Sequence, residues 1–280
     1  MLSGKETLIC ALDAKLATKF EKKLFEAAIN NLLDAYNPLR FNNFAYATRE
    51  LVRHILFRLS PDAEVLACQW YRNETKNERG VTRRQRIIFA IQGGLTDDYV
   101  QNTLQIDTAS ISKQIGAVVQ NLNKHTHIQQ DTIDIDIHKQ DEYVRETLES
   151  VTELFKVIEK SRQAVSQALI DHIDREVVNT AISETIIEID EVSTHHVIEE
   201  VLAEEVQIKS IDSTYITLAV YGTISAELQY GSDGDMRRGD GTTFYHGFPF
   251  SCVLKSRVET PDDFLSDDID FQVSNDGWYE

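Results

Sequence analysis

The sequence has few of the residues that staple a chain together or bind metal. Its 280 residues contain only three cysteines, which are Cys10, Cys68 and Cys252. They lie far apart, without CxxC spacing or a nearby set of histidines, so neither a disulfide framework nor a zinc site is predicted and we expect buried thiols. The paired histidines His195 and His196 also lack the spacing of a ligand set. No metal and no cofactor is expected, because phosphate-binding glycine loops and dinucleotide fingerprints are missing too.

Long hydrophobic runs are also missing. No stretch approaches the roughly 20 apolar residues that a membrane span needs. The first residues mix charges into their apolar run, unlike a signal peptide, so we expect a cytoplasmic protein without a membrane partner. Hydrophobic residues make up 42% and charged residues 26% of the chain, which is typical of a globular protein with a core.

Positive charge is scarce and unevenly distributed. The formal net charge is −18, yet the first 140 residues hold 18 Lys and Arg against 16 Asp and Glu, and the remainder hold 10 against 30. Lys and Arg neutralise phosphates when a protein coats DNA regardless of sequence, so that function is not expected. A nucleic-acid site in the first half remains open. The acidic second half either confers solubility, restrains a basic site or docks a partner.

Helical spacing of apolar residues dominates the first part of the chain. It predicts helices over residues 12–36, 43–59, 82–93 and 111–122, and one long helix over 141–173. A further short helix is predicted to start at Thr96. The last two helices before the long one have the spacing of a helix-turn-helix motif.

The pattern then changes to β-branched runs separated by turn residues. Antiparallel strands are predicted over residues 185–190, 206–211, 215–221, 224–230 and 248–258, with turns at Gly222 and at 231–235. The fold class is therefore α+β. We expect a helical domain over 1–138, a long linking helix over 139–184 and an acidic antiparallel β-rich domain over 185–280.

Two residues of the predicted helix over 43–59 carry candidate chemistry. Arg49 and His54 lie five positions apart, which places their side chains about 140° apart around a helix. A joint site therefore needs a neighbouring helix or the same helix of a second subunit. Histidine can move the proton of a 2′-hydroxyl at neutral pH, and arginine can hold a phosphate that gains charge, without a metal ion.

This spacing resembles the Arg-x4–6-His signature of the HEPN superfamily, which comprises all-α ribonuclease domains common in bacterial antiphage and toxin systems. The stretches AYNPLRFNNFAYATRELVRHIL, TRRQRIIFAIQGGLTDDYV, LNKHTHI and LQYGSDGD are also similar to the predicted nucleases found beside prokaryotic PIWI-related genes. The resemblance implies a metal-independent nuclease of a defence system that acts on RNA more than on DNA. It assigns catalysis to Arg49 and His54, converging across a homodimer interface, and implies a defence-system protein as a further partner.

Other basic residues are predicted to bind nucleic acid. They are Arg53, Arg83, Arg84, Arg86, Lys124, His125 and His127. The three arginines at 83–86 open a helix and either grip phosphate or form a solvated face. The last three follow a helix end, where cations also interact with the helix dipole.

Two other interpretations stay open, because about one Arg-x4–6-His pair is expected by chance in a chain of this composition. In the first, the protein is a non-enzymatic regulator whose residues 96–122 bind DNA through a recognition helix. That helix offers Ser110, Ser112, Lys113, Gln114 and Gln120. In the second, the helical domain serves only as a dimerisation scaffold.

Overall fold

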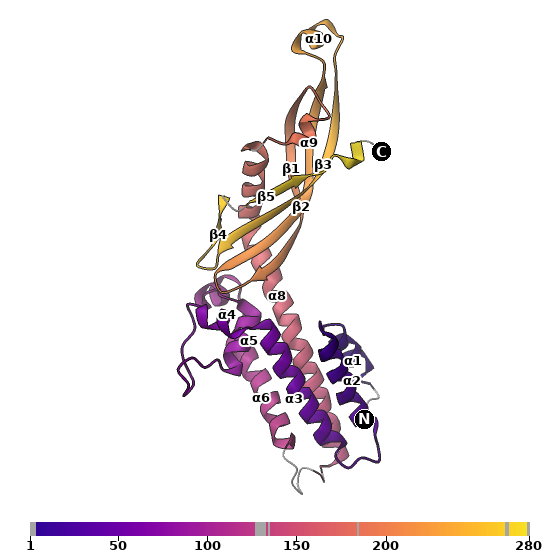
Figure 1. Cartoon of the computed structure of the whole chain (residues 1–280), viewed down its shortest axis with the longest axis vertical. Coiled ribbons are helices and arrows are strands. Elements are labelled where there is room, and N and C mark those ends of the chain that lie inside the picture. Colours follow the sequence, from indigo (N-terminus) through magenta and orange to yellow (C-terminus); the bar gives the residue numbers. More distant parts are fainter. Residues whose placement is uncertain (1–3, 127–132, 134, 184, 267–268, 279–280) are drawn as a thin grey trace. The chain divides into compact units, whose positions relative to one another are not determined.

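The computed structural model describes residues 4–126, 133, 135–183, 185–266 and 269–278. The chain divides into two compact units, Met1–Ser161 and Arg162–Glu280. The boundary falls inside one helix, α8 (Ile137–Ser183). Helices come first, then this long helix, and then an antiparallel sheet, so the predicted α+β class is confirmed (Figure 1).

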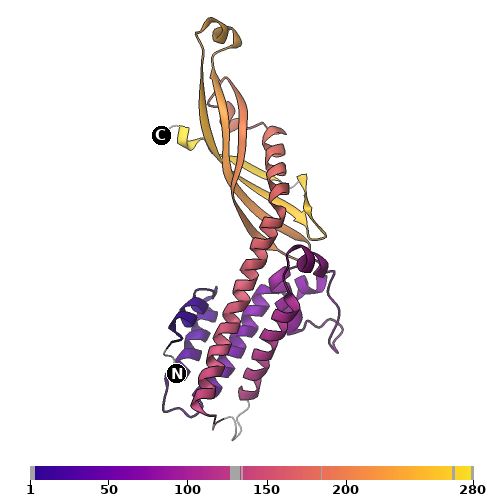
Figure 2. The ribbon, with the colours of Figure 1, turned by 180° about the vertical axis from the view of Figure 1, so that it is seen from behind.

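The first unit is a bundle of helices. Before α8 it contains α1 (Glu6–Asp13), α2 (Lys19–Leu33), α3 (Arg40–Leu59), α4 (Asp62–Ala67), α5 (Arg83–Gln92), the π-helix η1 (Tyr99–Thr103) and α6 (Thr108–Thr126). Helix α3 packs against α2, α5 and α6, and the first part of α8 runs along the bundle (Figure 2). The inward face of α3 carries Phe44, Leu51 and Ile55, which are fully buried. None of the described helices combines the length and the apolar character needed to cross a membrane.

The prediction of a single helix over residues 12–36 is wrong. The chain instead forms α1, a break and α2. Thr18 begins α2 with a capping box, in which its hydroxyl accepts from the Glu21 amide at 3.0 Å while the Glu21 carboxylate accepts from the amides of Ala17 and Thr18 at 2.9 and 3.2 Å. These local hydrogen bonds compete with helix continuation, although the apolar spacing runs on through the break.

Glu21 also ties α2 to α3 through an ion pair. Its carboxylate is 2% exposed and accepts from Arg58 Nε at 2.7 Å. Burial opposes ionisation, but the hydrogen bonds from Arg58, Thr18 and Ala17 together outweigh it and lower the pKa of Glu21 below its ordinary value. The native state therefore holds the charged form, and this stabilisation is complete above the ordinary pKa of 4.5 and is lost as the pH falls through the lowered pKa.

We expect Glu21→Gln to lower the free energy of unfolding by about 1.5–3 kcal/mol at pH 7, because it removes a charged partner from a buried hydrogen-bond set. Urea unfolding at pH 7 and pH 3.5 measures the difference, which should shrink at the lower pH. Glu26→Gln, on the exposed face of α2, is the matched control and should stay within about 0.5 kcal/mol of the wild type. An equal loss at both pH values would contradict the role given to the charge.

The helix predicted over 82–93 is confirmed as α5. Thr82 caps it with a capping box to Gln85, and Gly93, at φ 59°, ends it. The predictions over 43–59 and 111–122 are confirmed as α3 and α6, each with slightly wider bounds. Cys68 and Cys252 are buried as expected, whereas Cys10 is exposed because it lies on the outer side of α1.

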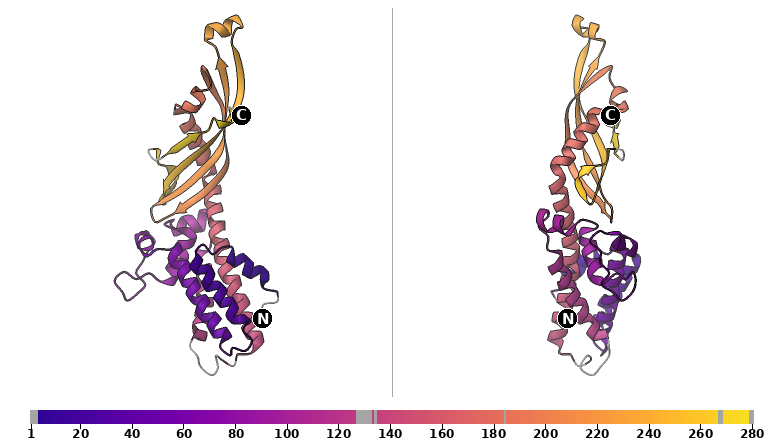
Figure 3. Two further views of the ribbon diagram at one scale, coloured as in Figure 1. Left: turned by 45° about the vertical axis from the view of Figure 1, so that its right-hand side comes forward. Right: turned by 90° about the vertical axis from the view of Figure 1, so that its left-hand side faces the viewer.

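The second unit is an antiparallel sheet with the last part of α8. Its strands are β1 (His195–Ile211), β2 (Tyr215–Tyr230), β3 (Thr242–Arg257), β4 (Thr260–Phe264) and β5 (Asp270–Val273), in the order β1-β2-β3-β4, with β5 also paired to β3. The end of α8 runs along the sheet and buries Val165, Leu169, Ile173 and Val177 (Figure 3). A 3₁₀ turn, η3 (Asp276–Trp278), follows β5.

Two predictions in this unit are wrong. The two strands predicted on either side of Gly222 form one strand, β2. This glycine is needed for close approach of β1 and not for a turn, because a Cβ there would lie 2.0 Å from the Leu202 carbonyl oxygen. Residues 185–190 were predicted as a strand but contain the short helix α9 (Ile187–Asp190). The amides of Ile189 and Asp190 donate to the Ile186 carbonyl and form its turn. The turn predicted over 231–235 lies where the chain reverses between β2 and β3, and this connection also contains a short helix, α10 (Asp233–Arg238), with Ser232 as its cap.

Candidate functional site

Arg49 and His54 both lie on α3, directed toward different neighbours. The Arg49 side chain is 27% exposed, and its Nη1 donates to Thr126 Oγ1 of α6 at 3.4 Å. The partly exposed ring of His54 packs edge-on against Phe20 of α2, with 4.7 Å between ring centres. The imidazole is thus outside the apolar core. Within one chain the two side chains diverge, as the helical spacing predicts.

A series of polar contacts along α3 connects the two residues. Arg49 Nη2 and Arg53 Nε donate to the two oxygens of Glu50 at 2.7 and 2.8 Å. Arg53 Nη2 lies 3.3 Å from His54 Nε2. A guanidinium can only donate hydrogen bonds, so in this arrangement Nε2 is the acceptor and carries a lone pair. In that tautomer the lone pair points at Arg53 Nη2, so Arg53 must move away before Nε2 can accept from another donor.

Glu50 does not neutralise the site. Burial opposes its ionisation, but the hydrogen bonds from Arg49 and Arg53 outweigh this effect and lower the pKa of Glu50. One carboxylate is thus shared by two guanidiniums. With Arg83 nearby, three positive groups face one negative group, and the surface around α3 at this point favours an anion.

Arg83 is the first residue of α5 and stands beside this surface. It makes no ion pair with any residue that the structure describes. Partial loss of hydration, and then repulsion from Arg49, lower the pKa of Arg83, although it remains protonated at neutral pH. The helix dipole adds positive charge at the same place, so this grouping is unfavourable unless an anion joins it.

A pocket of about 190 Å³ opens between α3 and the start of α5. It is lined by Arg53, Leu56, Phe57, Val81, Arg83 and Arg86. The buried guanidinium of Arg86 is bound to the protein itself: it donates to the Ser60 carbonyl at 2.6 Å and to Asp62, and its carbon lies 3.7 Å from the centre of the Phe57 ring. Arg86 therefore shapes the wall, while Arg83 has donors available to a ligand.

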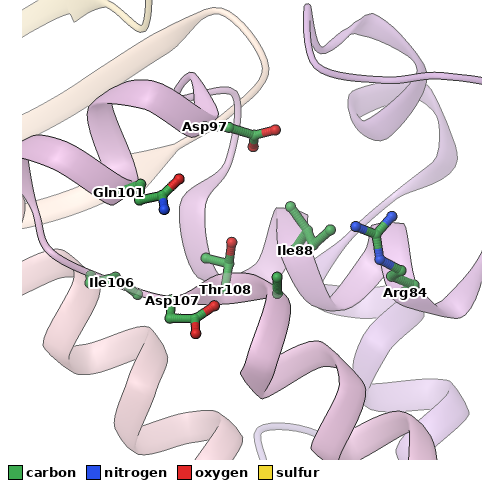
Figure 4. Close-up of a pocket in the computed structure, with 8 residues that line it drawn as sticks. Arg84, Ile88, Asp97, Gln101, Ile106, Asp107 and Thr108 are labelled. Atoms are coloured by element: carbon green, nitrogen blue, oxygen red, sulfur yellow. The ribbon is translucent and has the colours of Figure 1, made fainter.

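The neighbouring Arg84 points to a different pocket, of about 160 Å³. Arg84 and Ile88 of α5 face Asp97, Gln101 and Asp107 there (Figure 4). Arg84 is also paired with Glu74 at 2.9 Å. Hydrogen bonds from the hydroxyl and the amide of Ser110 lower the pKa of Asp107, so the pocket holds two carboxylates against one guanidinium. This pocket disfavours a phosphate.

The candidates predicted to follow a helix end, Lys124, His125 and His127, are not equivalent, because α6 runs on to Thr126 and contains the first two in its last turn. Lys124 is exposed. His125 is 9% exposed, and its ring packs 5.1 Å from Phe41 and 5.3 Å from Tyr143, which places it in the core between α3, α6 and α8. His127 lies outside the described residues. The predicted recognition residue Ser112 is buried, whereas Lys113, Gln114 and Gln120 are exposed.

Two exposed aromatic rings flank the arginines of α3 and were not predicted as site residues. Tyr46 is 55% and Phe57 45% exposed. The Arg49 guanidinium lies 5.3 Å from the Tyr46 ring centre, and that of Arg53 lies 5.6 Å from Phe57. Three- and four-residue spacing brings such side chains onto one helix face, and this was the available signal in the sequence. No group of three His, Cys, Asp or Glu side chains within the described ranges is arranged to hold a metal ion.

Two family models match the chain, and both carry the description "Predicted pPIWI-associating nuclease". One matches residues 13–151, which include Arg49, His54 and Arg83, and the other matches residues 158–279. No curated protein and no solved structure matches the chain.

Proposed function

This chain belongs to the family of predicted pPIWI-associating nucleases, and we propose that it cuts RNA without a metal ion, through Arg49 and His54. Family membership supports a nuclease role with nucleic acid as the partner. RNA as the substrate, independence of metal and a place in bacterial defence are the further steps of the proposal. The observation that carries it is the polar series from Arg49 to His54 on the surface of α3, beside a pocket whose Arg83 makes no ion pair with a residue that the structure describes.

The proposed reaction uses the substrate's own 2′-hydroxyl as the nucleophile. The bound phosphate draws Arg53 away from the imidazole, and His54 Nε2 then accepts the hydroxyl proton as the 2′-oxygen bonds to the adjacent phosphorus. The bond from phosphorus to the 5′-oxygen breaks, and that oxygen takes a proton from water or from an imidazolium. Arg49 stabilises the charge that builds up on the phosphate oxygens. The products are a 2′,3′-cyclic phosphate and a 5′-hydroxyl end.

A homodimer completes the proposed site. The side chains of Arg49 and His54 diverge within one chain, so a phosphate bound to one Arg49 is best served by the imidazole of a second copy. The HEPN resemblance of this pair implies the same convergence. We further propose that the acidic second unit docks a defence-system protein, because its charge repels nucleic acid and complements a basic surface.

We expect the purified chain to cut single-stranded RNA in the presence of EDTA and to leave DNA of the same sequence intact, because DNA lacks the nucleophile. A single 2′-deoxy nucleotide at the cut position should block cleavage there. Gel analysis of end-labelled strands measures both results. The Arg49→Ala/His54→Ala double variant is the negative control. Equal cleavage by both proteins, or loss of all cleavage in EDTA, would overturn the proposal.

A further inference from the structure

The pocket beside α5 combines two kinds of wall. Leu56, Phe57 and Val81 form an apolar side, and the polar side consists only of guanidinium groups. A guanidinium has N–H donors and no acceptor, so every polar side-chain group in this lining is a donor. The pocket is therefore suited to a ligand with a flat apolar body and acceptor atoms along one edge.

A phosphate alone does not fit this description. It has no apolar part to place against Leu56 and Phe57, and about 190 Å³ is the volume of roughly six liquid water molecules, more than one phosphate group fills. Arg86 covers one face of the Phe57 ring, and the part of the ring that stays exposed offers the kind of surface on which unpaired bases pack. Arg49 and Arg53 of α3 share the single carboxylate of Glu50, so the same surface has an excess of positive charge for phosphates.

We propose that this pocket binds a guanine base of the RNA, next to the phosphate that is cut; the inference rests on the proposed nuclease function. Guanine presents the acceptors N7 and O6 side by side, which a single arginine can bind with two parallel hydrogen bonds. Arg83 is the arginine available for this, since Arg53 is bonded to Glu50 and Arg86 to Ser60. Adenine places an amino group beside N7, so an N–H donor of the base would face an N–H donor of Arg83.

Binding is measured with the full-length His54→Ala variant, so that cleavage does not interfere. The probes are fluorescent tetraribonucleotides that differ only in one base, read by anisotropy. We expect the guanine probe to bind about tenfold more tightly than the adenine probe. Arg83→Lys, added to this variant, keeps the charge but loses the two-pronged geometry, so overall affinity should persist while the preference falls to about twofold or less.

Arg145→Lys is the matched control, because Arg145 is an exposed arginine of the same unit whose ion pair with Glu149 is long, at 3.9 Å. It should leave the guanine preference unchanged. Equal affinity for all four bases, or a preference that survives Arg83→Lys, would overturn the guanine site. Cleavage by the wild-type chain is scored separately: a guanine preference without cleavage refutes the nuclease proposal alone, and cleavage with equal base affinities refutes the guanine site alone.

Discussion

Replacing His54 with alanine is expected to lower the rate of RNA cleavage by a factor of about 10² to 10⁴, the usual contribution of one general base. The reason is the proton transfer to Nε2, whose lone pair faces Arg53 Nη2 at 3.3 Å in the free protein and becomes available when a bound phosphate draws Arg53 away. Single-turnover rates at saturating enzyme measure the chemical step. The ring contacts Phe20 at the edge of α2 and is partly exposed, so its removal leaves the core of the bundle intact.

A matched control is His138→Ala, which removes an exposed histidine at the start of α8. It should cut RNA at the wild-type rate. Helix content, measured by circular dichroism, should be the same in both variants. A His54→Ala protein that is folded and cuts within a factor of about three of the wild type would remove the imidazole from the mechanism, because a general base contributes far more.

The elements that were predicted correctly carry their signals in neighbouring residues. Thr82 and Gln85 define the start of α5 and Gly93 defines its end, so a short window of sequence is enough. The break before α2 was missed because it depends on a carboxylate that is also held by Arg58, 37 residues away. Apolar spacing does not report such a contact, and it continues through Leu12 and Leu16, both buried.

The role of a glycine in the sheet also depends on residues that are distant in the sequence. Gly93 ends a helix with a positive φ, whereas Gly222 lies inside β2, where the neighbouring strands leave no room for a Cβ. A turn and a close approach select the same residue, and only the partner strand distinguishes them. This is why one strand of 16 residues was predicted as two.

The candidate site was predictable only along its own helix. The wheel angle between Arg49 and His54 follows from their spacing, and so does the shared face with Tyr46 and Phe57. The approach of Arg83 to Arg49 depends on how α5 packs against α3, which no local pattern encodes. Arg83, Arg84 and Arg86 therefore looked alike in the sequence, yet their side chains leave the helix in different directions and meet different partners.

Mixing two inactive variants is expected to restore activity if the site is shared between subunits. In a dimer of one Arg49→Ala chain and one His54→Ala chain, one site keeps an arginine from the second chain and a histidine from the first, and the other site has neither. Random exchange makes half of the dimers mixed, so an equal mixture should reach about a quarter of the wild-type rate. The rate is measured after the two proteins have been incubated together, with light scattering to establish the dimer.

The control mixes His54→Ala with the Arg49→Ala/His54→Ala double variant. The first protein still supplies Arg49, but neither supplies His54, so no activity should be recovered. Recovery in this control would show that the assay measures a contaminating nuclease. Absence of recovery in the first mixture, with exchange demonstrated, would place each site within one chain. In that case Arg53 rather than Arg49 becomes the partner of His54, since Arg53 Nη2 lies 3.3 Å from the imidazole in the same chain. A surface arginine and an imidazole already in contact can bind one phosphate together, so the homodimer would no longer be needed for catalysis.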